Sequence, residues 1–189
     1  MPYRAPDTEN PQIKQTRDHM LAAAKELLAE TGPAGLTYSV LAERAGVTRQ
    51  TLYRHWPTRS ALLVDMILVG NDGYPESGSD PAVVAAAWLA SLREGVSDPA
   101  RRAAVLAVTA QADTDPDSGQ ALADLNADRL AALNELLEPS GVQVTQDEYP
   151  LLYGPVLARI FFEQAEATDE FIALVVAHWL AGRDPGRVP

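Results

Sequence analysis

The sequence predicts an all-α protein of about nine helices, and two kinds of pattern support this prediction. Apolar residues recur at helical spacing along most of the 189 residues, whereas no alternating run with an Asn-Gly or Asp-Gly turn indicates a β-hairpin. Helix starts are marked by Asp-Pro pairs, because Asp is a preferred N-cap and Pro is favoured at the first helical position. These pairs occur at residues 80–81, 98–99 and 115–116. Two more starts are predicted by the capping-box spacing of Thr145 and Glu148, and by Thr168, which precedes two acids.

The first two helices are predicted from an apolar stripe and from the residues that flank them. A stripe of Ile, Leu and Ala predicts a helix from about Pro11 to Glu30, with Gly32 as its C-terminal cap. Thr37 is the expected N-cap of a short second helix that ends near Ala45. Gly46 follows, where a tight turn requires a left-handed backbone conformation that glycine adopts without steric cost.

A third and a fourth helix follow directly. Thr48 is the expected N-cap of the third helix, which runs to about His55. Pro57 ends it, and Thr58 is placed to cap the fourth helix. Two short helices joined by a glycine turn are the outline of a helix-turn-helix motif.

Charge is distributed unevenly along the chain. The formal net charge is −11, yet residues 1–69 contain 8 basic against 7 acidic residues and residues 70–189 contain 7 against 19. The acidity therefore belongs to the second part of the chain. The near-neutral first part remains able to present a local basic face to nucleic acid.

The absence of several motifs excludes several classes of function. There is no cysteine, which excludes disulfides, thiolate metal sites and a cysteine nucleophile. Signatures of serine hydrolases, zinc proteases, phosphate loops and dinucleotide-binding folds are absent, and the three histidines are scattered. We therefore expect no enzyme, no cofactor and no metal site.

The sequence also predicts a location. The start, MPYRAPDTENPQIKQTR, has no apolar run, which predicts that there is no signal peptide. The longest apolar run, residues 171–181, is shorter than the ~20 residues that span a bilayer. We expect a cytoplasmic protein without membrane association.

The stretch GVTRQTLYRHW, residues 46–56, gathers the polar chemistry of the N-terminal part. On a helical wheel, Arg49, Gln50, Tyr53 and Arg54 fall on one arc without an acid, and apolar side chains fall opposite. Arginine pairs with guanine edges and glutamine with adenine, and a helix of this width fits the major groove. The arc predicts a DNA contact; the alternative is a solvated arginine-containing surface.

At these residues the sequence resembles the TetR family of bacterial transcriptional regulators. The resemblance is carried by LTYSVLAERAGVTRQTLYRHWPTRSALL, residues 36–63. Its pattern is a threonine that opens the second helix, Ala-x-x-Ala-Gly-Val, Thr-Leu-Tyr-x-His-aromatic, and a basic residue at the start of the fourth helix. It covers residues 16–66, about a quarter of the chain.

The resemblance implies roles for individual residues. It implies phosphate contacts for Thr37, Thr48, Tyr53 and His55, and base contacts for Arg49, Gln50 and Arg54. It places Thr51 near the DNA backbone or a base. It makes Arg59 a phosphate contact at the start of the fourth helix.

The resemblance also implies that the C-terminal helices bind a small molecule and form a homodimer. The residues support a dimer independently, because the run FIALVVAHWLA (171–181) is apolar nearly all round and the helix before it has two apolar stripes. We expect pairing through the last two helices, with a monomer whose last helix is core as the alternative. Met66, Trp88 and Tyr153 are candidates to line the ligand pocket, or else are plain core.

The expected domains are an N-terminal arm with the helix-turn-helix, residues 1–57, and a helical ligand-binding and dimerisation domain, residues 58–189, joined through the fourth helix. The expected function is a homodimeric regulator of operator DNA, a repressor released by a small-molecule effector. The alternative is an all-α architectural or partner-recruiting DNA-binding factor without ligand control.

Overall fold

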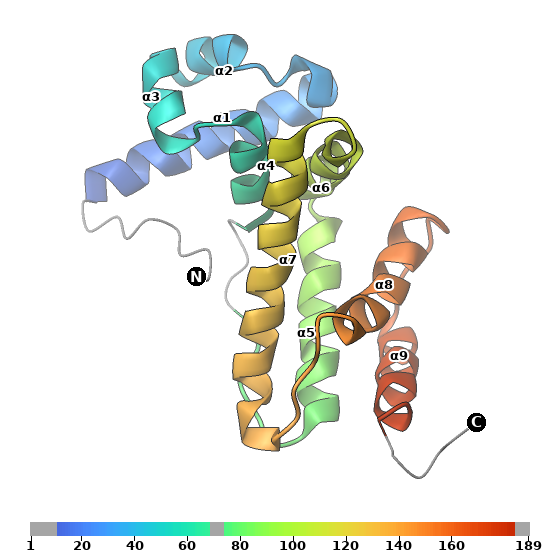
Figure 1. Cartoon of the computed structure of the whole chain (residues 1–189). Helices are drawn as coiled ribbons and strands as arrows, with labels where there is room; N and C mark the ends of the chain where they lie inside the picture. Colours follow the sequence, from blue (N-terminus) through green and yellow to red (C-terminus); the bar gives the residue numbers. More distant parts are fainter. Residues whose placement is uncertain (1–10, 69–73, 184–189) are drawn as a thin grey trace. The chain divides into compact units, whose positions relative to one another are not determined.

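The computed structural model describes residues 11–68 and 74–183, and over these residues it is helical with no strand (Figure 1). The helices are α1 (Pro11–Gly35), α2 (Tyr38–Ala45), α3 (Arg49–His55), α4 (Arg59–Leu68), α5 (Pro81–Ser97), α6 (Pro99–Ala112), α7 (Pro116–Leu137), the 3-10 helix η1 (Glu138–Ser140), α8 (Glu148–Phe161) and α9 (Asp169–Ala181). This confirms the predicted all-α fold of about nine helices. None of the described helices is both long and apolar enough to cross a membrane.

The chain divides into two compact units, each assembled from two separate stretches. The first unit comprises residues 1–70 and 95–126, and the second comprises residues 71–94 and 127–189. Both α5 and α7 contribute residues to each unit. These units are defined by compactness, whereas the predicted division after residue 57 separates functions. That division stays a prediction.

Capping residues begin the helices where the sequence predicts. The Asp98 carboxylate accepts a hydrogen bond of 2.7 Å from the backbone N–H of Arg101, and Asp80 accepts one of 2.9 Å from the N–H of Ala82. At the start of α7, the Asp115 carboxylate likewise accepts a hydrogen bond of 3.2 Å from the backbone N–H of Ser118. Each bond satisfies a backbone donor that the first turn of a helix leaves without an intrahelical partner.

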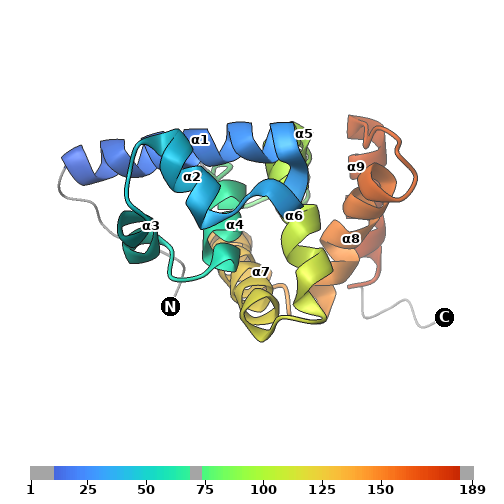
Figure 2. The ribbon, with the colours of Figure 1, turned by 90° about the horizontal axis from the view of Figure 1, so that it is seen from above.

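Figures 1 and 2 show the course of the helices of the first unit. Its core consists of apolar side chains from α1, α2, α3, α4 and α6, together with Leu125 of α7. Leu27, Leu41, Leu52 and Leu62 are among its fully buried members. Met66 on α4 also belongs to this core. Met66 is thus a buried core residue, and its predicted contact with a ligand stays a prediction.

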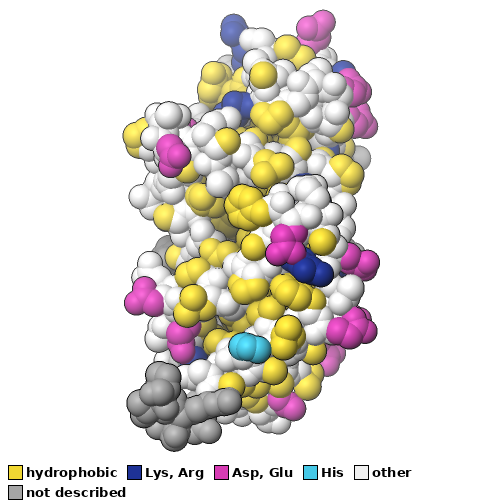
Figure 3. All heavy atoms as spheres, turned by 90° about the vertical axis from the view of Figure 1, so that its right-hand side faces the viewer, with side chains coloured by type: hydrophobic (Ala, Val, Ile, Leu, Met, Phe, Trp, Pro, Cys, Tyr) yellow, Lys and Arg dark blue, Asp and Glu magenta, His cyan; other side chains and the backbone are white. Residues whose placement is uncertain are grey.

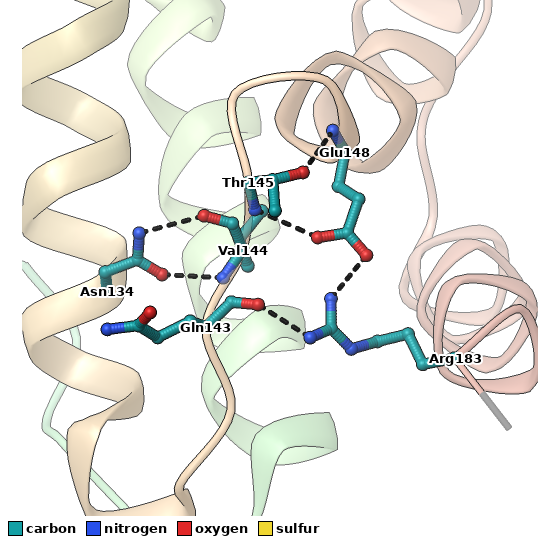
Figure 4. Close-up of polar contacts among 6 residues, drawn as sticks. All are labelled: Asn134, Gln143, Val144, Thr145, Glu148 and Arg183. Carbon is teal, nitrogen blue, oxygen red and sulfur yellow. Dashed lines mark hydrogen bonds and ion pairs between the residues drawn. The ribbon is translucent and has the colours of Figure 1, made fainter. Parts of the chain in front are cut away.

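A polar network in the second unit joins the end of α7, the loop before α8 and the end of α9 (Figure 4). The Asn134 amide donates to the carbonyl of Val144 at 3.0 Å and accepts from its N–H at 2.8 Å. Thr145 and Glu148 exchange the two bonds of a capping box, at 2.9 Å and 3.2 Å. Arg183 donates to the Glu148 carboxylate and to the Gln143 carbonyl, each at 2.6 Å. The Glu148 carboxylate thus joins the start of α8 to Arg183, two residues after the end of α9.

Replacing Glu148 with Gln should lower stability in a pH-dependent way. The N–H of Thr145, and then Arg183, lower the pKa of the Glu148 carboxyl from its ordinary value of 4.5. A carboxyl whose pKa is lowered by folding contributes its full stability above the ordinary pKa. This contribution is lost as the pH falls through the lower, folded-state pKa. We expect Glu148→Gln to cost about 1–2 kcal/mol at neutral pH, in urea unfolding, and progressively less as the pH falls below 4.5.

Glu138→Gln is the control, because Glu138 is an exposed carboxylate of the same unit. Its unfolding free energy should match that of the parent at every pH. A Glu148→Gln effect that does not change with pH would contradict the assigned role of the carboxylate charge.

Candidate nucleic-acid interface

The turn between α2 and α3 has the geometry that the sequence predicts. Thr37 caps α2 by accepting from the N–H of Val40 at 3.3 Å. Gly46 has a φ of 65°, in the left-handed region, and its N–H donates back to the end of α2. A Cβ at this position would meet no atom within 4 Å, so the requirement for glycine comes from the backbone conformation and not from crowding.

Helix α3 separates an apolar face from a polar one. Thr48 caps it by accepting from the N–H of Thr51 at 3.1 Å, and the two hydroxyl oxygens lie 2.9 Å apart. Leu52, together with Trp56 just after the helix, is buried on the inner side. The outer side exposes Arg49, Gln50, Tyr53 and Arg54, while Thr51 and His55 are half-buried. The structure therefore places the four predicted arc residues together on an exposed surface.

Tyr38 on α2 supports α3 from behind. Its hydroxyl oxygen lies 2.7 Å from the carbonyl oxygens of both Trp56 and Thr58, so it donates to the backbone that follows α3. Its ring packs edge-on against the ring of Tyr53, with centroids 4.7 Å apart. Burial raises the pKa of Tyr38 well above its usual value, which keeps the hydroxyl a donor. Sequence reasoning missed this residue, because the signal lies in a partner that is 18 residues away.

A buried ion pair holds α3 from the other side. Asp65 on α4 is fully buried, and one of its oxygens pairs with the guanidinium of Arg17 on α1. Its other oxygen accepts a hydrogen bond of 2.8 Å from the indole N–H of Trp56. The carboxylate thus links α1, α4 and the end of α3. Sequence reasoning also missed this network, although a lone acid within the apolar run ALLVDMIL was a signal.

His55 and Arg59 lie at the edge of this network. Burial, followed by the charges of Arg54 and Arg17, lowers the pKa of His55 from its usual 6.5, so the ring is mainly neutral at pH 7. A neutral imidazole still carries one N–H that can donate to a phosphate. The Arg59 guanidinium is half-buried and donates to the carbonyl of Pro33, near the end of α1. Arg59 thus has a structural partner that the sequence did not suggest, and its phosphate contact stays a prediction.

The three predicted pocket residues belong to different units, and their contact with a ligand stays a prediction. Met66 belongs to the core of the first unit, whereas Trp88 and Tyr153 belong to the second. Trp88 is fully buried, stacks on Tyr74 with centroids 5.2 Å apart, and has a guanidinium over its ring. Tyr153 is half-buried, with its ring 4.7 Å from that of Tyr149.

Comparisons with known proteins agree with this geometry. The family model "Bacterial regulatory proteins, tetR family" matches residues 20–66. The uncharacterized HTH-type transcriptional regulator YdeS of Bacillus subtilis is 36% identical over 58 residues, which are 31% of this chain and 29% of that protein. The match thus spans less than a third of that relative.

Solved structures extend the likeness to most of the chain. The TetR family transcription regulator SCO0332 is 25% identical, with a TM-score of 0.65 over 90% of this chain and 100% of that one. The regulator SCO7518 of Streptomyces coelicolor A3(2) has a TM-score of 0.63 at 20% identity, over 87% and 98% of the two chains, and shows the fold alone.

The fold and the exposed helix define a helix-turn-helix protein with a helical C-terminal part. Residues 20–66 match the TetR family of bacterial regulatory proteins, and a solved structure of that family shares the fold over 90% of the chain. These matches confirm the predicted family, whose members are DNA-binding regulators and not enzymes.

Removing the carboxylate of Asp65 should destabilise the first unit strongly. Asp65→Asn leaves the Arg17 guanidinium buried without a counter-charge, and breaking a buried pair in this way costs about 3–5 kcal/mol. The measurement is urea unfolding of the full chain.

The matched control is Asp18→Asn, which removes an exposed ion pair with Lys14 on the same helix. Exposed pairs contribute about 0–1 kcal/mol, so the control should stay close to the parent. Equal losses in the two variants would show that Asp65 is not the organising group.

Proposed function

We propose that this protein regulates transcription by placing α3 in the major groove of operator DNA. The observation that carries the proposal is the exposed face of α3, which holds Arg49, Gln50, Tyr53 and Arg54 with no acid in the helix. Arg and Gln can form paired hydrogen bonds with guanine and adenine edges. The buried contacts behind α3 fix its backbone, which favours base contacts that depend on geometry.

The other predicted contacts surround this face and serve to position it. Thr37 and Thr48 stand at the N-termini of α2 and α3, where hydroxyls and backbone N–H groups suit phosphate oxygens. Tyr53 presents an exposed phenol, and His55 presents a half-buried neutral ring. In this proposal these groups hold the DNA backbone, while Arg49, Gln50 and Arg54 read bases and Thr51 lies near the backbone or a base.

A homodimer through α8 and α9 is part of the proposal. The exposed fractions of three apolar side chains on or next to these helices are high: 71% for Leu151, 87% for Phe162 and 55% for Leu174. Apolar side chains gather over this face in Figure 3, and a groove of about 550 Å³ runs between the helices, lined by residues that include Pro155 and Phe171. An apolar surface of this kind favours self-association, and a two-fold dimer would present two copies of α3 about 34–36 Å apart.

The finer proposal is a repressor that a small molecule releases from DNA. Such a ligand must bind the DNA-free form more tightly than the DNA-bound form, since a ligand with equal affinity for both shifts nothing. The second unit supports this proposal because several of its buried polar atoms have no hydrogen-bond partner. They include Nε1 of Trp88, the hydroxyl of Ser91 and Nη2 of Arg129.

Arg49→Ala should weaken operator binding by about 1–3 kcal/mol and relax the sequence preference. The measurement is fluorescence anisotropy against DNA that flanks the gene, with scrambled DNA for comparison, over a salt series. The matched control is Arg44→Ala on α2, whose guanidinium pairs with Glu30 at 2.5 Å. The control should retain the preference of the parent; equal preference in the parent and Arg49→Ala would contradict the role of Arg49.

Leu174→Glu should convert a dimer into a monomer, because it places a charge within the apolar α8–α9 face. Sedimentation velocity measures the change in mass. The matched control is Leu106→Glu, since Leu106 has a similar exposed fraction of 50% but lies on α6. A dimer that survives Leu174→Glu would place the interface elsewhere.

A further inference from the structure

We propose that Arg129 of α7 binds the carboxylate of a small organic acid, and that this acid is the class of effector the second unit accepts. The inference rests on the proposed ligand-controlled function and names the chemistry of that ligand. It is carried by a buried guanidinium that has no carboxylate partner among the residues the structure describes.

The burial of Arg129 is the first observation. Only 8% of the residue is exposed, and its guanidinium lies over the ring of Trp88, with the central carbon 5.3 Å from the ring centroid. The terminal nitrogen Nη2 is buried without a hydrogen-bond partner. No carboxylate in residues 11–68 or 74–183 forms an ion pair with Arg129. A buried arginine stays charged, and folded proteins almost always pair such a charge, so an anion is the missing partner.

The surroundings of Arg129 contain groups that suit an anion. Burial raises the pKa of both Tyr149 and Tyr153, while the nearby positive charge of Arg129 opposes that rise. Both phenols are therefore neutral at pH 7. The Tyr149 oxygen accepts a hydrogen bond from the Arg129 guanidinium, and each phenol keeps an O–H that can donate to an anion. Ser91 lies one turn after Trp88 on α5, and its hydroxyl oxygen is also buried without a partner. Donors thus outnumber the acceptors that the protein itself supplies.

The aromatic side chains indicate the remainder of the ligand. The ring of Tyr74 stacks on Trp88 at an interplanar angle of 21°, and Tyr149 packs against Tyr153 with centroids 4.7 Å apart. These rings surround the guanidinium with apolar surface, and ligand sites combine such surface with few polar groups.

The charge and shape of the donors select a carboxylate. A guanidinium presents two parallel N–H groups that match the two oxygens of a carboxylate. One positive charge with neutral phenols balances one negative charge, which favours a monocarboxylic acid over a phosphate dianion. All five groups, Tyr74, Trp88, Arg129, Tyr149 and Tyr153, belong to the second unit, so the site is complete within it.

The test compares acids with their uncharged amides on the full-length protein without DNA. The probes are acetate, hexanoate and benzoate, with acetamide, hexanamide and benzamide as partners and sodium chloride to equalise ionic strength. Ligand that binds only the folded state raises Tm, so we expect at least one acid to raise Tm more than its amide. No difference in any of the three pairs overturns the proposal.

Variants assign the effect to Arg129. Arg129→Gln should weaken binding of the active acid about tenfold or more, as expected for loss of a charge-assisted bond. Arg159→Gln is the matched control, because it removes an equal charge from a residue of the same unit that Glu163 already pairs at 2.9 Å. The control should bind like the parent. Equal weakening in both variants, or none in Arg129→Gln, overturns the proposal.

Two further measurements keep the outcome interpretable. Arg129→Lys retains the charge and removes the planar pair of donors, so it should fold and bind the acid with intermediate affinity even where Arg129→Gln is unstable. Operator binding by the parent, measured separately by anisotropy, tests the proposed function on its own. An intact operator response with no response to the acids would reject this inference alone, whereas acid binding without operator binding would reject the proposed function alone.

Discussion

The organisation of the N-terminal unit depends on the buried carboxylate of Asp65. Desolvating a charge is costly, so both of its oxygens need partners, and those partners come from α1 and from the end of α3. Satisfying one group therefore determines how three parts of the chain meet. The leucine-rich core around it is less specific, because apolar contacts tolerate repacking. The polar contacts select one arrangement, and α3 is held in that arrangement.

This arrangement gives α3 an inner side that packs on the first unit and an outer side that is exposed. Leu52, Trp56 and the hydroxyl of Tyr38 hold the inner side through contacts that do not use the outer side chains. The outer side chains make few contacts within the protein: the ring of Tyr53 packs against Tyr38, and Arg49 donates to the Ser39 hydroxyl at 3.5 Å. The exposed positions of α3 can accordingly change at little cost to the packing of the first unit.

Local chemistry explains which features the sequence could predict. Caps such as Thr37, Thr48 and Asp98, and the turn at Gly46, depend on residues within four positions, so a reader of the sequence can recognise them. The pairing of Arg17 with Asp65 joins residues 48 positions apart, and the contact of Arg59 with Pro33 joins residues 26 apart. Arg129 illustrates the same limit, because its burial beside Trp88 depends on how α5 and α7 approach each other. The side-chain types of Trp88 and Tyr153 make them candidates from the sequence, but nothing in the sequence indicates that the Arg129 guanidinium lies over the Trp88 ring.

The division of the chain into units that are each discontinuous has a consequence for how such proteins diversify. Each unit needs two separated stretches, and α5 and α7 supply residues to both. A single recombination crossover within the gene would therefore join mismatched halves of at least one core. A change confined to one unit is therefore made by substitution of individual residues, such as those on the outer side of α3 or around Arg129, and not by exchange of one continuous segment.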